Sequence, residues 1–331
     1  MKKLLTLLLS ALLILTSAFA VGCKETNEKN TYAFIVPDGA PALAVAKLIN
    51  DKDDLGIGKT VDYKVVDAGQ IQPNLAKGSA DFIVAPVNLA SKLYKASGSD
   101  HYVMVAVLTH GNFYIMSTEQ ITVNDLVGKQ VAVPNMGAVP DWTLKMTLNS
   151  HGLSYVVEQD EYAGKVNIKY YKDGQQIVSS IIGGIETIGL VPEPAASALE
   201  KQMKAQNKDI YRLDLQELYD SQTKSYPQAV LMVKKSVLKG NSDLVETLQT
   251  KITESASWIK TNVETAVGAI NSKGGNSLQV PALSEKAIDG CKIYWQDALN
   301  AKTSVKNYID KIIEIDSEKA TAVKDDFFNI D

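Results

Sequence analysis

Three carboxylates and two aromatic side chains lie where short apolar segments of this sequence give way to turns. The acidic residues are Asp38, Asp141 and Glu193, and the aromatic ones are Trp142 and Tyr114. A carboxylate pairs with a positive ring or an amino group, and aromatic rings stack on planar or cationic ligands. These turns contain no Lys or Arg, so an anion buried there would lack a basic partner. The pattern predicts a site for a cationic or neutral heterocycle.

Each of these side chains also has a structural explanation. Asp38 and Asp141 could cap the helices that follow them, and Trp142 could belong to the core of its helix. Glu193 is the stronger candidate for a ligand contact, because prolines on both sides make its turn rigid. His110 stands at a predicted crossing between lobes, where a structural hydrogen bond explains it better than catalysis does.

The candidate ligand-binding residues all lie at predicted strand ends, in the turns that follow, or at that crossing. They are Asp38, Ala40, Pro86, Asn88, His110, Tyr114, Asn135, Met136, Gly137, Asp141, Trp142 and Glu193. Catalysis has no positive support: the chain has three scattered histidines, no metal-ligand spacing, no nucleophile beside a base and no phosphate-binding GxxxxGK[ST] loop. We therefore expect a binding protein with no catalytic residue, metal or cofactor.

The segments that position these residues occur twice in the sequence. QIQPNLAKGSADFIVAPVNLASKL at 70–93 aligns without a gap with QIVSSIIGGIETIGLVPEPAASAL at 176–199, 106 positions later. Both copies read as an apolar helix ending in Gly, a short apolar strand, a Pro and a helix of small residues. VPDGAPALAVAKL at 36–48 is likewise echoed by VPNMGAVPDWTLKMTL at 133–148. Two copies of one supersecondary unit predict two similar lobes.

Strands alternate with helices along the chain, which predicts an α/β fold with two Rossmann-like lobes and parallel pairing with right-handed crossovers. From residue 242 onward the pattern is mainly helical. The predicted strands are 32–36, 61–66, 82–85, 102–108, 113–117, 130–133, 166–171, 210–213 and 229–233. The predicted helices include 42–49, 89–94, 244–259, 284–298 and 304–315. The turns expected to face a ligand are 37–41, 85–88, 134–142 and 191–194, since ligands bind beyond the carboxyl ends of strands.

The chain is expected to cross between lobes twice, near residue 110 and near residue 228. This assigns 31–110 plus 229–331 to the first lobe and 111–228 to the second. Two crossing strands form a hinge that bends without swivelling freely.

The N-terminus has the features of an export signal. Lys2 and Lys3 precede an apolar run, and a small-residue cleavage site leads directly to Cys23. The run is shorter than the ~20 residues of a membrane span. Residues 1–22 are predicted to be a lipoprotein signal peptide, Cys23 the lipidated first residue, carrying palmitate or a similar chain, and 23–30 a polar tether. The formal net charge of -4 and the single arginine, Arg212, argue against a nucleic-acid partner.

The chain resembles an ABC-transporter solute-binding lipoprotein of the type II periplasmic-binding-protein fold. The resemblance rests on the lipobox at Cys23, VPDGAP at 36–41, GSADFIVAPVN at 78–88 and GLVPEP at 189–194. The nearest group includes binding proteins for aliphatic sulfonates, nitrate and thiamine-related pyrimidines. The resemblance implies a monomer, lipid-anchored outside the cell membrane, that closes on one small molecule and docks to a permease coupled to an ATPase.

Thiamine or its aminopyrimidine precursor fits the predicted cleft best, and a sulfonate or nitrate-like anion is the alternative. A same-fold biosynthetic enzyme is a rival from another class, for example one that rearranges menaquinone precursors or a pyrimidine synthase, although the export signal argues against it. A ligand-sensing partner of a membrane receptor also stays open.

Overall fold

The computed structural model describes residues 31–96, 98 and 100–329. The predicted signal peptide, the tether and Cys23 lie outside these residues. No helix in the described part of the chain is long and apolar enough to cross a bilayer.

The strands form two six-stranded sheets, and we call each sheet with its helices a lobe. Lobe 1 has the order β12 (Ile293–Asp297), β4 (Tyr102–Thr109), β11 (Ala229–Lys234), β3 (Phe82–Pro86), β1 (Thr31–Pro37) and β2 (Thr60–Val66). Lobe 2 has the order β10 (Tyr211–Asp214), β5 (Phe113–Ser117), β9 (Ile188–Pro192), β6 (Gln130–Pro134), β8 (Val166–Tyr171) and β7 (Tyr155–Val157). The two-lobed α/β architecture is confirmed. The residues at which the lobes begin and end along the chain stay a prediction.

Both sheets are mixed, whereas the sequence predicted parallel pairing. In lobe 1, β3 runs parallel to β1 and antiparallel to β11. In lobe 2, β9 runs parallel to β6 and antiparallel to β5. The antiparallel neighbour in each case is a strand that the chain enters directly after a crossing, so each crossing adds a strand of opposite direction to the sheet it reaches.

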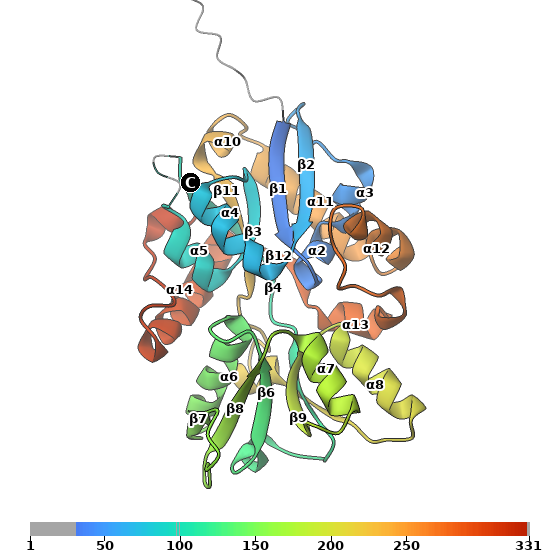
Figure 1. Cartoon of the computed structure of the whole chain (residues 1–331). Helices are drawn as coiled ribbons and strands as arrows, with labels where there is room; N and C mark the ends of the chain where they lie inside the picture. Colours follow the sequence, from blue (N-terminus) through green and yellow to red (C-terminus); the bar gives the residue numbers. More distant parts are fainter. Residues whose placement is uncertain (1–30, 97, 99, 330–331) are drawn as a thin grey trace, which may run out of the picture. The chain divides into compact units, whose positions relative to one another are not determined.

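Helices cover both faces of each sheet (Figure 1). The side chains of β3 alternate between two apolar clusters, with Phe82 and Val84 on one face and Ile83 and Ala85 on the other, as the twofold period of a strand requires. Lobe 1 carries α2 (Ala40–Ala44), α3 (Ala46–Asp51), α4 (Ile71–Lys77), α5 (Val87–Leu93), α10 (Lys235–Lys239), α11 (Leu244–Trp258), α12 (Val263–Asn271), α13 (Glu285–Gly290) and α14 (Ala298–Ile315). Lobe 2 carries α6 (Val139–Ser150), α7 (Gly174–Ile182), α8 (Ala195–Ala205) and α9 (Leu215–Tyr219). Short 3₁₀ turns are η1 (Ala68–Gln70), η2 (Val123–Leu126), η3 (Val280–Ala282) and η4 (Asp325–Phe327).

The repeated unit forms the same elements in both lobes, α4–β3–α5 and α7–β9–α8. One glycine shared by the copies has a clear reason: Gly78 and Gly184 follow the first helix with φ angles of 61° and 72°, a conformation that costs other residues steric strain.

Two helix predictions were wrong. The expected helix 42–49 is divided at Val45, whose φ of -116° and ψ of 12° separate α2 from α3. The expected helix 284–298 stops at Gly290, and β12 pairs instead with β4 at the sheet edge. The side chains of β12 explain this, because Ile293 and Trp295 pack on the core while Tyr294 between them is exposed, which is a strand period.

Candidate functional site

Asp38 follows β1 and is bound by its own lobe. Its Oδ1 accepts from the backbone N–H of Gly39 at 2.8 Å, and its Oδ2 accepts from those of Asn276 and Ser277 at 2.8 Å each. It therefore fixes the loop after α12 and makes no side-chain cap to α2. Ala40, the first residue of α2, is buried.

Asp141 in α6 is fully buried and has four polar contacts. Lys145 Nζ lies 3.0 Å from both carboxylate oxygens, Tyr170 donates its hydroxyl at 2.9 Å, and Gly137 donates its backbone N–H at 2.9 Å. Burial beside this carboxylate raises the pKa of Tyr170. Trp142 is also buried, and its indole N–H donates to the Gly137 carbonyl at 3.0 Å. In this structure both side chains hold the turn before α6.

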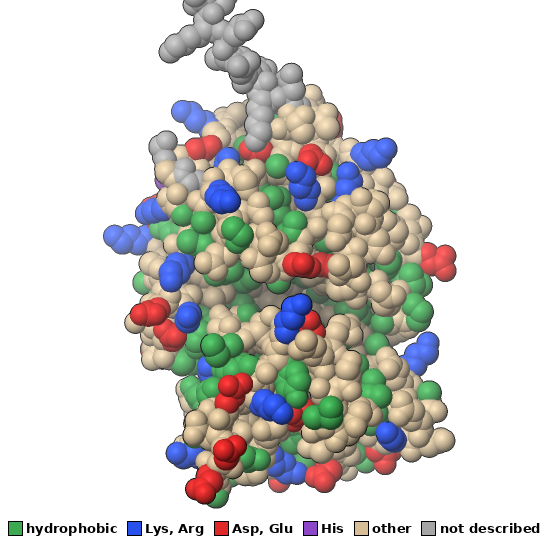
Figure 2. Space-filling model, in the orientation of Figure 1, with side chains coloured by type: hydrophobic (Ala, Val, Ile, Leu, Met, Phe, Trp, Pro, Cys, Tyr) green, Lys and Arg blue, Asp and Glu red, His purple; other side chains and the backbone are tan. Residues whose placement is uncertain are grey.

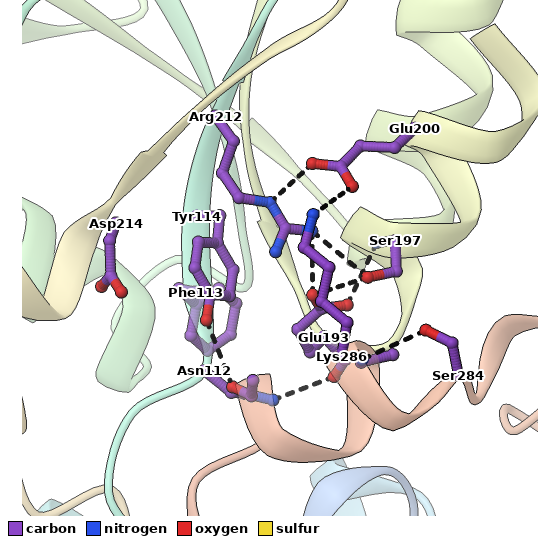
Figure 3. Close-up of polar contacts among 12 residues, drawn as sticks. Asn112, Phe113, Tyr114, Glu193, Ser197, Glu200, Arg212, Asp214, Ser284 and Lys286 are labelled. Carbon is purple, nitrogen blue, oxygen red and sulfur yellow. Dashed lines mark hydrogen bonds and ion pairs between the residues drawn. The ribbon is translucent and has the colours of Figure 1, made fainter. Parts of the chain in front are cut away.

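Glu193 follows β9, and its carboxylate is also buried. Arg212 Nη2 lies 2.8 Å from its Oε1, while Ser197 donates its hydroxyl at 2.8 Å and its backbone N–H at 3.0 Å. Figure 3 shows Arg212 reaching from β10 toward Glu193, Ser197 and Glu200. Glu193 therefore has a basic partner within the protein, although its turn contains no Lys or Arg. This ion pair could not be predicted from the residues of the turn, because Arg212 lies 19 positions further along the chain.

The face of the Tyr114 ring is occupied as well. The Arg212 guanidinium carbon lies 4.2 Å from the ring centre, and the Tyr114 hydroxyl donates to the Gly290 carbonyl of lobe 1 at 3.5 Å. A Cβ on Gly290 would lie 2.8 Å from Glu193 Cγ, so only glycine permits this close approach of α13 to lobe 2. Lys286 of α13 and Glu200 of α8 form an ion pair at 2.9 Å across the same boundary.

Asn88, at the start of α5, differs from the three carboxylates because one of its polar atoms is unsatisfied. Its Nδ2 donates weakly to the Lys319 carbonyl at 3.4 Å, and this contact orients the amide. Its Oδ1 is buried without a hydrogen-bond partner among the described residues. Buried polar atoms are nearly always hydrogen-bonded in native proteins, and an unpaired one points to a missing ligand, ion or water.

A chain of amides at the crossings leaves a second free acceptor. Asn112 Nδ2 donates to the Glu193 carbonyl at 3.0 Å, so its Oδ1 accepts from Gln228 Nε2 at 3.0 Å. These contacts fix both amide orientations and leave Gln228 Oε1 buried and unpaired among the described residues.

Backbone hydrogen bonds bring Asn88, Thr109 and Gln228 together at the same end of the neighbouring strands β3, β4 and β11. Gln228 donates its N–H to the Thr109 carbonyl at 3.0 Å and accepts from the Val87 N–H at 3.1 Å. Asn88 follows Val87, and the buried Thr109 hydroxyl also lacks a partner in the described part of the chain. Sequence reasoning missed Thr109, Asn112 and Gln228, although the place of Gln228 just before the second crossing was a usable signal.

The turn between β6 and α6 presents backbone and exposed side chains. Asn135 and Gly137 have positive φ angles of 56° and 75°, Asn135 is exposed, and the Met136 side chain is 72% exposed. Lys319 of lobe 1 approaches here, because a Cβ on Gly137 would lie 3.9 Å from its Cε. Pro86 is partly buried at the end of β3.

His110 is buried between the crossings and the sheet edge. Its ring stacks on Tyr294 at 3.5 Å between centres, and its Nε2–H donates to the Tyr294 carbonyl at 3.2 Å. Burial lowers the pKa of His110 to about 4, so the ring is neutral at pH 7. These contacts give it a structural role at the hinge.

Solved structures similar to this one share its whole architecture. A crystal structure of an ABC transporter from Parabacteroides distasonis superposes with a TM-score of 0.73 at 19% identity, covering 91% of this chain and 99% of the other. The periplasmic aliphatic sulphonate-binding protein SsuA from Escherichia coli gives 0.64 at 14% identity, covering 91% of each chain. The ligand-binding component of an ABC-type import system from Staphylococcus aureus, solved with zinc bound, gives 0.62 at 14% identity, covering 91% and 97%.

This chain has the fold of the ABC-transporter solute-binding proteins. No protein-family model and no curated protein matches its sequence, so the likeness establishes the fold. Figure 2 shows the surface hollowed between the lobes in that view.

Proposed function

We propose that this protein is the extracytoplasmic solute-binding component of an ABC importer, without enzymatic activity. It binds one small molecule between its lobes as a monomer and delivers it to a permease coupled to an ATPase. The observation that carries the proposal is the set of unpaired buried polar atoms at Asn88, Thr109 and Gln228, placed where β3, β4 and β11 meet the crossings in a two-lobed fold.

The chemistry of these atoms favours a ligand that donates hydrogen bonds. Asn88 Oδ1 and Gln228 Oε1 are acceptors only, because the opposite end of each amide is already engaged. An amino group or ring N–H satisfies them, whereas nitrate and the sulfonate group offer acceptors alone. An aminopyrimidine, free or within thiamine, fits this requirement. The basis for this ligand class is therefore the free amide oxygens, since the carboxylates of Asp141 and Glu193 are already paired.

One observation favours the alternative anion. Lys319 lies beside Gly137 at the N-terminal turn of α6, and it forms no ion pair with another described residue. A helix N-terminus with a nearby cation attracts an anion, so a sulfonate or nitrate-like ligand is the second candidate.

Calorimetry on the purified protein distinguishes the two ligand classes. Thiamine and 4-amino-5-hydroxymethyl-2-methylpyrimidine are titrated beside taurine and nitrate, with wild type, Asn88→Ala, Gln228→Ala and an exposed control, Asn50→Ala. We expect the pyrimidines to bind wild type and the control alike, and each cleft variant to lose at least tenfold, about 1.4 kcal/mol. Binding of taurine or nitrate alone, weakened by Lys319→Met, would establish the second candidate. Mass spectrometry of the recovered ligand tests the enzyme alternative, which an altered product would support.

Membrane fractionation tests the anchor. Cys23→Ser removes the sulfur that would carry the fatty acid, so the variant is expected in the soluble extracytoplasmic fraction while wild type sediments with membranes. An unchanged distribution would remove the lipid anchor from the proposal.

A further inference from the structure

A cavity of about 930 Å³ lies at the hinge, apart from the four turns of the proposed cleft. Its lining includes His110, Tyr219, Tyr226, Tyr294, Asn307 and Lys311, and no described residue of those turns. The cavity has the size of a small-molecule site.

Both lobes and the second crossing supply its walls. Tyr219 ends α9 of lobe 2, Tyr226 lies in the crossing, and Tyr294 belongs to β12 of lobe 1. Asn307 and Lys311 lie one turn apart on α14. A molecule held here contacts parts of the chain that move relative to each other when the hinge bends.

Tyr294 gives the cavity an aromatic platform. One face of its ring is covered by His110, with an interplanar angle of 4°, and the side chain is 44% exposed. A second planar ring can stack on the outer face of Tyr294. The buried His110 beneath it and the hydrogen bond from His110 to the Tyr294 carbonyl hold this ring in place.

The charges around the cavity leave one cation unpaired. Glu217 is engaged by Lys224 at 2.8 Å. Hydrogen bonds from Thr223 and Gln222 lower the pKa of Asp220, and the positive charge of Lys311 lowers it slightly further. Lys311 Nζ lies 4.8 Å from the centre of the Tyr219 ring, and it has no ion pair with any described residue. The cavity thus combines a lysine that lies over an aromatic ring and forms no ion pair with a described residue with a second aromatic ring, that of Tyr294, whose outer face is uncovered.

We propose that this cavity is a second binding site, for a planar aromatic carboxylic acid. The ring stacks on Tyr294, the carboxylate pairs with Lys311, and the side chain of Asn307 lies within the same wall. Because such a ligand contacts both lobes, it stabilises the arrangement of the lobes in this structure. The proposal does not rest on the solute-binding role or on the identity of the cleft ligand.

The test uses 4-hydroxybenzoate as the probe and the full chain as the protein. Calorimetry is performed with wild type, Lys311→Met and Tyr294→Ala. The matched controls are Lys239→Met, an exposed lysine on α10, and Tyr294→Phe, which keeps the ring. We expect binding to wild type and both controls, with at least a fivefold loss in Lys311→Met and Tyr294→Ala.

The same probe is expected to raise the thermal unfolding midpoint of wild type with concentration, by mass action, and to leave that of Lys311→Met unchanged. Circular dichroism confirms that each variant is folded. No binding to wild type at millimolar probe would overturn the proposal, as would equal affinity in all five proteins. Equal binding of the uncharged analogue benzyl alcohol would overturn the role of Lys311. Cleft binding of a pyrimidine is measured separately, so either site can fail alone.

Discussion

The turn after β3 in lobe 1 and the turn after β9 in lobe 2 both begin with proline and then diverge. After Pro86 come the buried Val87 and Asn88, whose Oδ1 has no partner among the described residues. After Pro192 comes Glu193, whose carboxylate is bound by Arg212 and Ser197. The two copies thus share the order of their elements, α4–β3–α5 and α7–β9–α8, and differ in which one keeps an unsatisfied polar atom.

The comparison shows that a charged side chain in such a turn need not be available to bind a ligand. A carboxylate in a turn is an obvious candidate for a ligand contact when only the sequence is known. In the structure, an ion pair and two hydrogen bonds leave the carboxylate oxygens of Glu193 little capacity to bind a ligand. The neutral Asn88 keeps a buried acceptor that only a ligand or water can satisfy. Ligand choice is therefore expected to depend on the lobe 1 copy, and the lobe 2 copy is expected to maintain the fold.

The largest effect is expected from Glu193→Gln. Removing one member of a buried ion pair leaves the other charge uncompensated, and among the described residues the partly exposed Glu200 is then the remaining ion-pair partner of Arg212. We expect the free energy of unfolding to fall by about 3 kcal/mol, measured by urea denaturation. The partly exposed Glu200→Gln is the control within the same network and should cost less. If Glu193→Gln unfolds like wild type but no longer binds the cleft ligand, the comparison between the copies is reversed.

The edge strands of the two sheets extend the comparison. β10 supplies Arg212 to hold Glu193 by charge, whereas β12 supplies Tyr294 to hold His110 by stacking. Because burial lowers the folded-state pKa of His110 to about 4, the unfolded chain, with an ordinary pKa near 6.5, binds the proton first as the pH falls. The contribution of the neutral His110 to the free energy of unfolding is complete above about pH 6.5 and declines as the pH falls to about 4.

We expect a loss of about 2 kcal/mol at pH 5 relative to pH 7.5 from this group, measured by urea denaturation across that range. His110→Gln should have a flatter profile, since Gln does not titrate. An equally steep profile in that variant would show that other groups are responsible.

The approach of α13 to lobe 2 gives a third test. A methyl group on Gly290 would meet Glu193 Cγ at 2.8 Å and the Tyr114 hydroxyl at 3.1 Å. Gly290→Val is expected to force the lobes apart here and weaken the cleft ligand about tenfold, or 1.4 kcal/mol, by calorimetry. Gly268→Ala is the control, because a Cβ there meets nothing within 4 Å. Unchanged affinity in Gly290→Val would show that binding does not require this contact.

Much of the fold could be predicted because its signals are local. The apolar run Phe82–Pro86 and its copy Ile188–Pro192 are strands as expected, since buried strands are continuous and bounded by turns. β12 was missed because its pattern is short and follows a helical segment, and its strand state depends on pairing with the distant β4. The strand conformation of β12 therefore depends on tertiary contacts and not on its local sequence alone.

The site was harder to predict because its chemistry depends on residues far apart in the chain. Residue type and turn position identified Glu193 and Asp141 as candidates, but Arg212 and Lys145, which neutralise them, lie outside the predicted turns. Gln228 was missed for the same reason: its free oxygen is defined by a hydrogen bond from its amide nitrogen to Asn112, across 116 positions. Spacing in a sequence does not show which polar atoms remain unpaired.

The smallest expected effect tests whether Asn88, in the lobe 1 copy, serves ligand binding or the stability of the fold. Asn88→Leu replaces an amide whose oxygen is unsatisfied and whose nitrogen has only a 3.4 Å contact with the Lys319 carbonyl. A side chain of similar volume without an unpaired acceptor should stabilise the ligand-free protein by about 1 kcal/mol, measured by urea denaturation, while abolishing binding of the cleft ligand. Asn112→Leu is the matched control, because both ends of that amide are hydrogen-bonded, and it should destabilise the protein. Destabilisation of similar size in both variants would mean that Asn88 is satisfied by tightly bound water and serves the fold, as Glu193 does in the other copy.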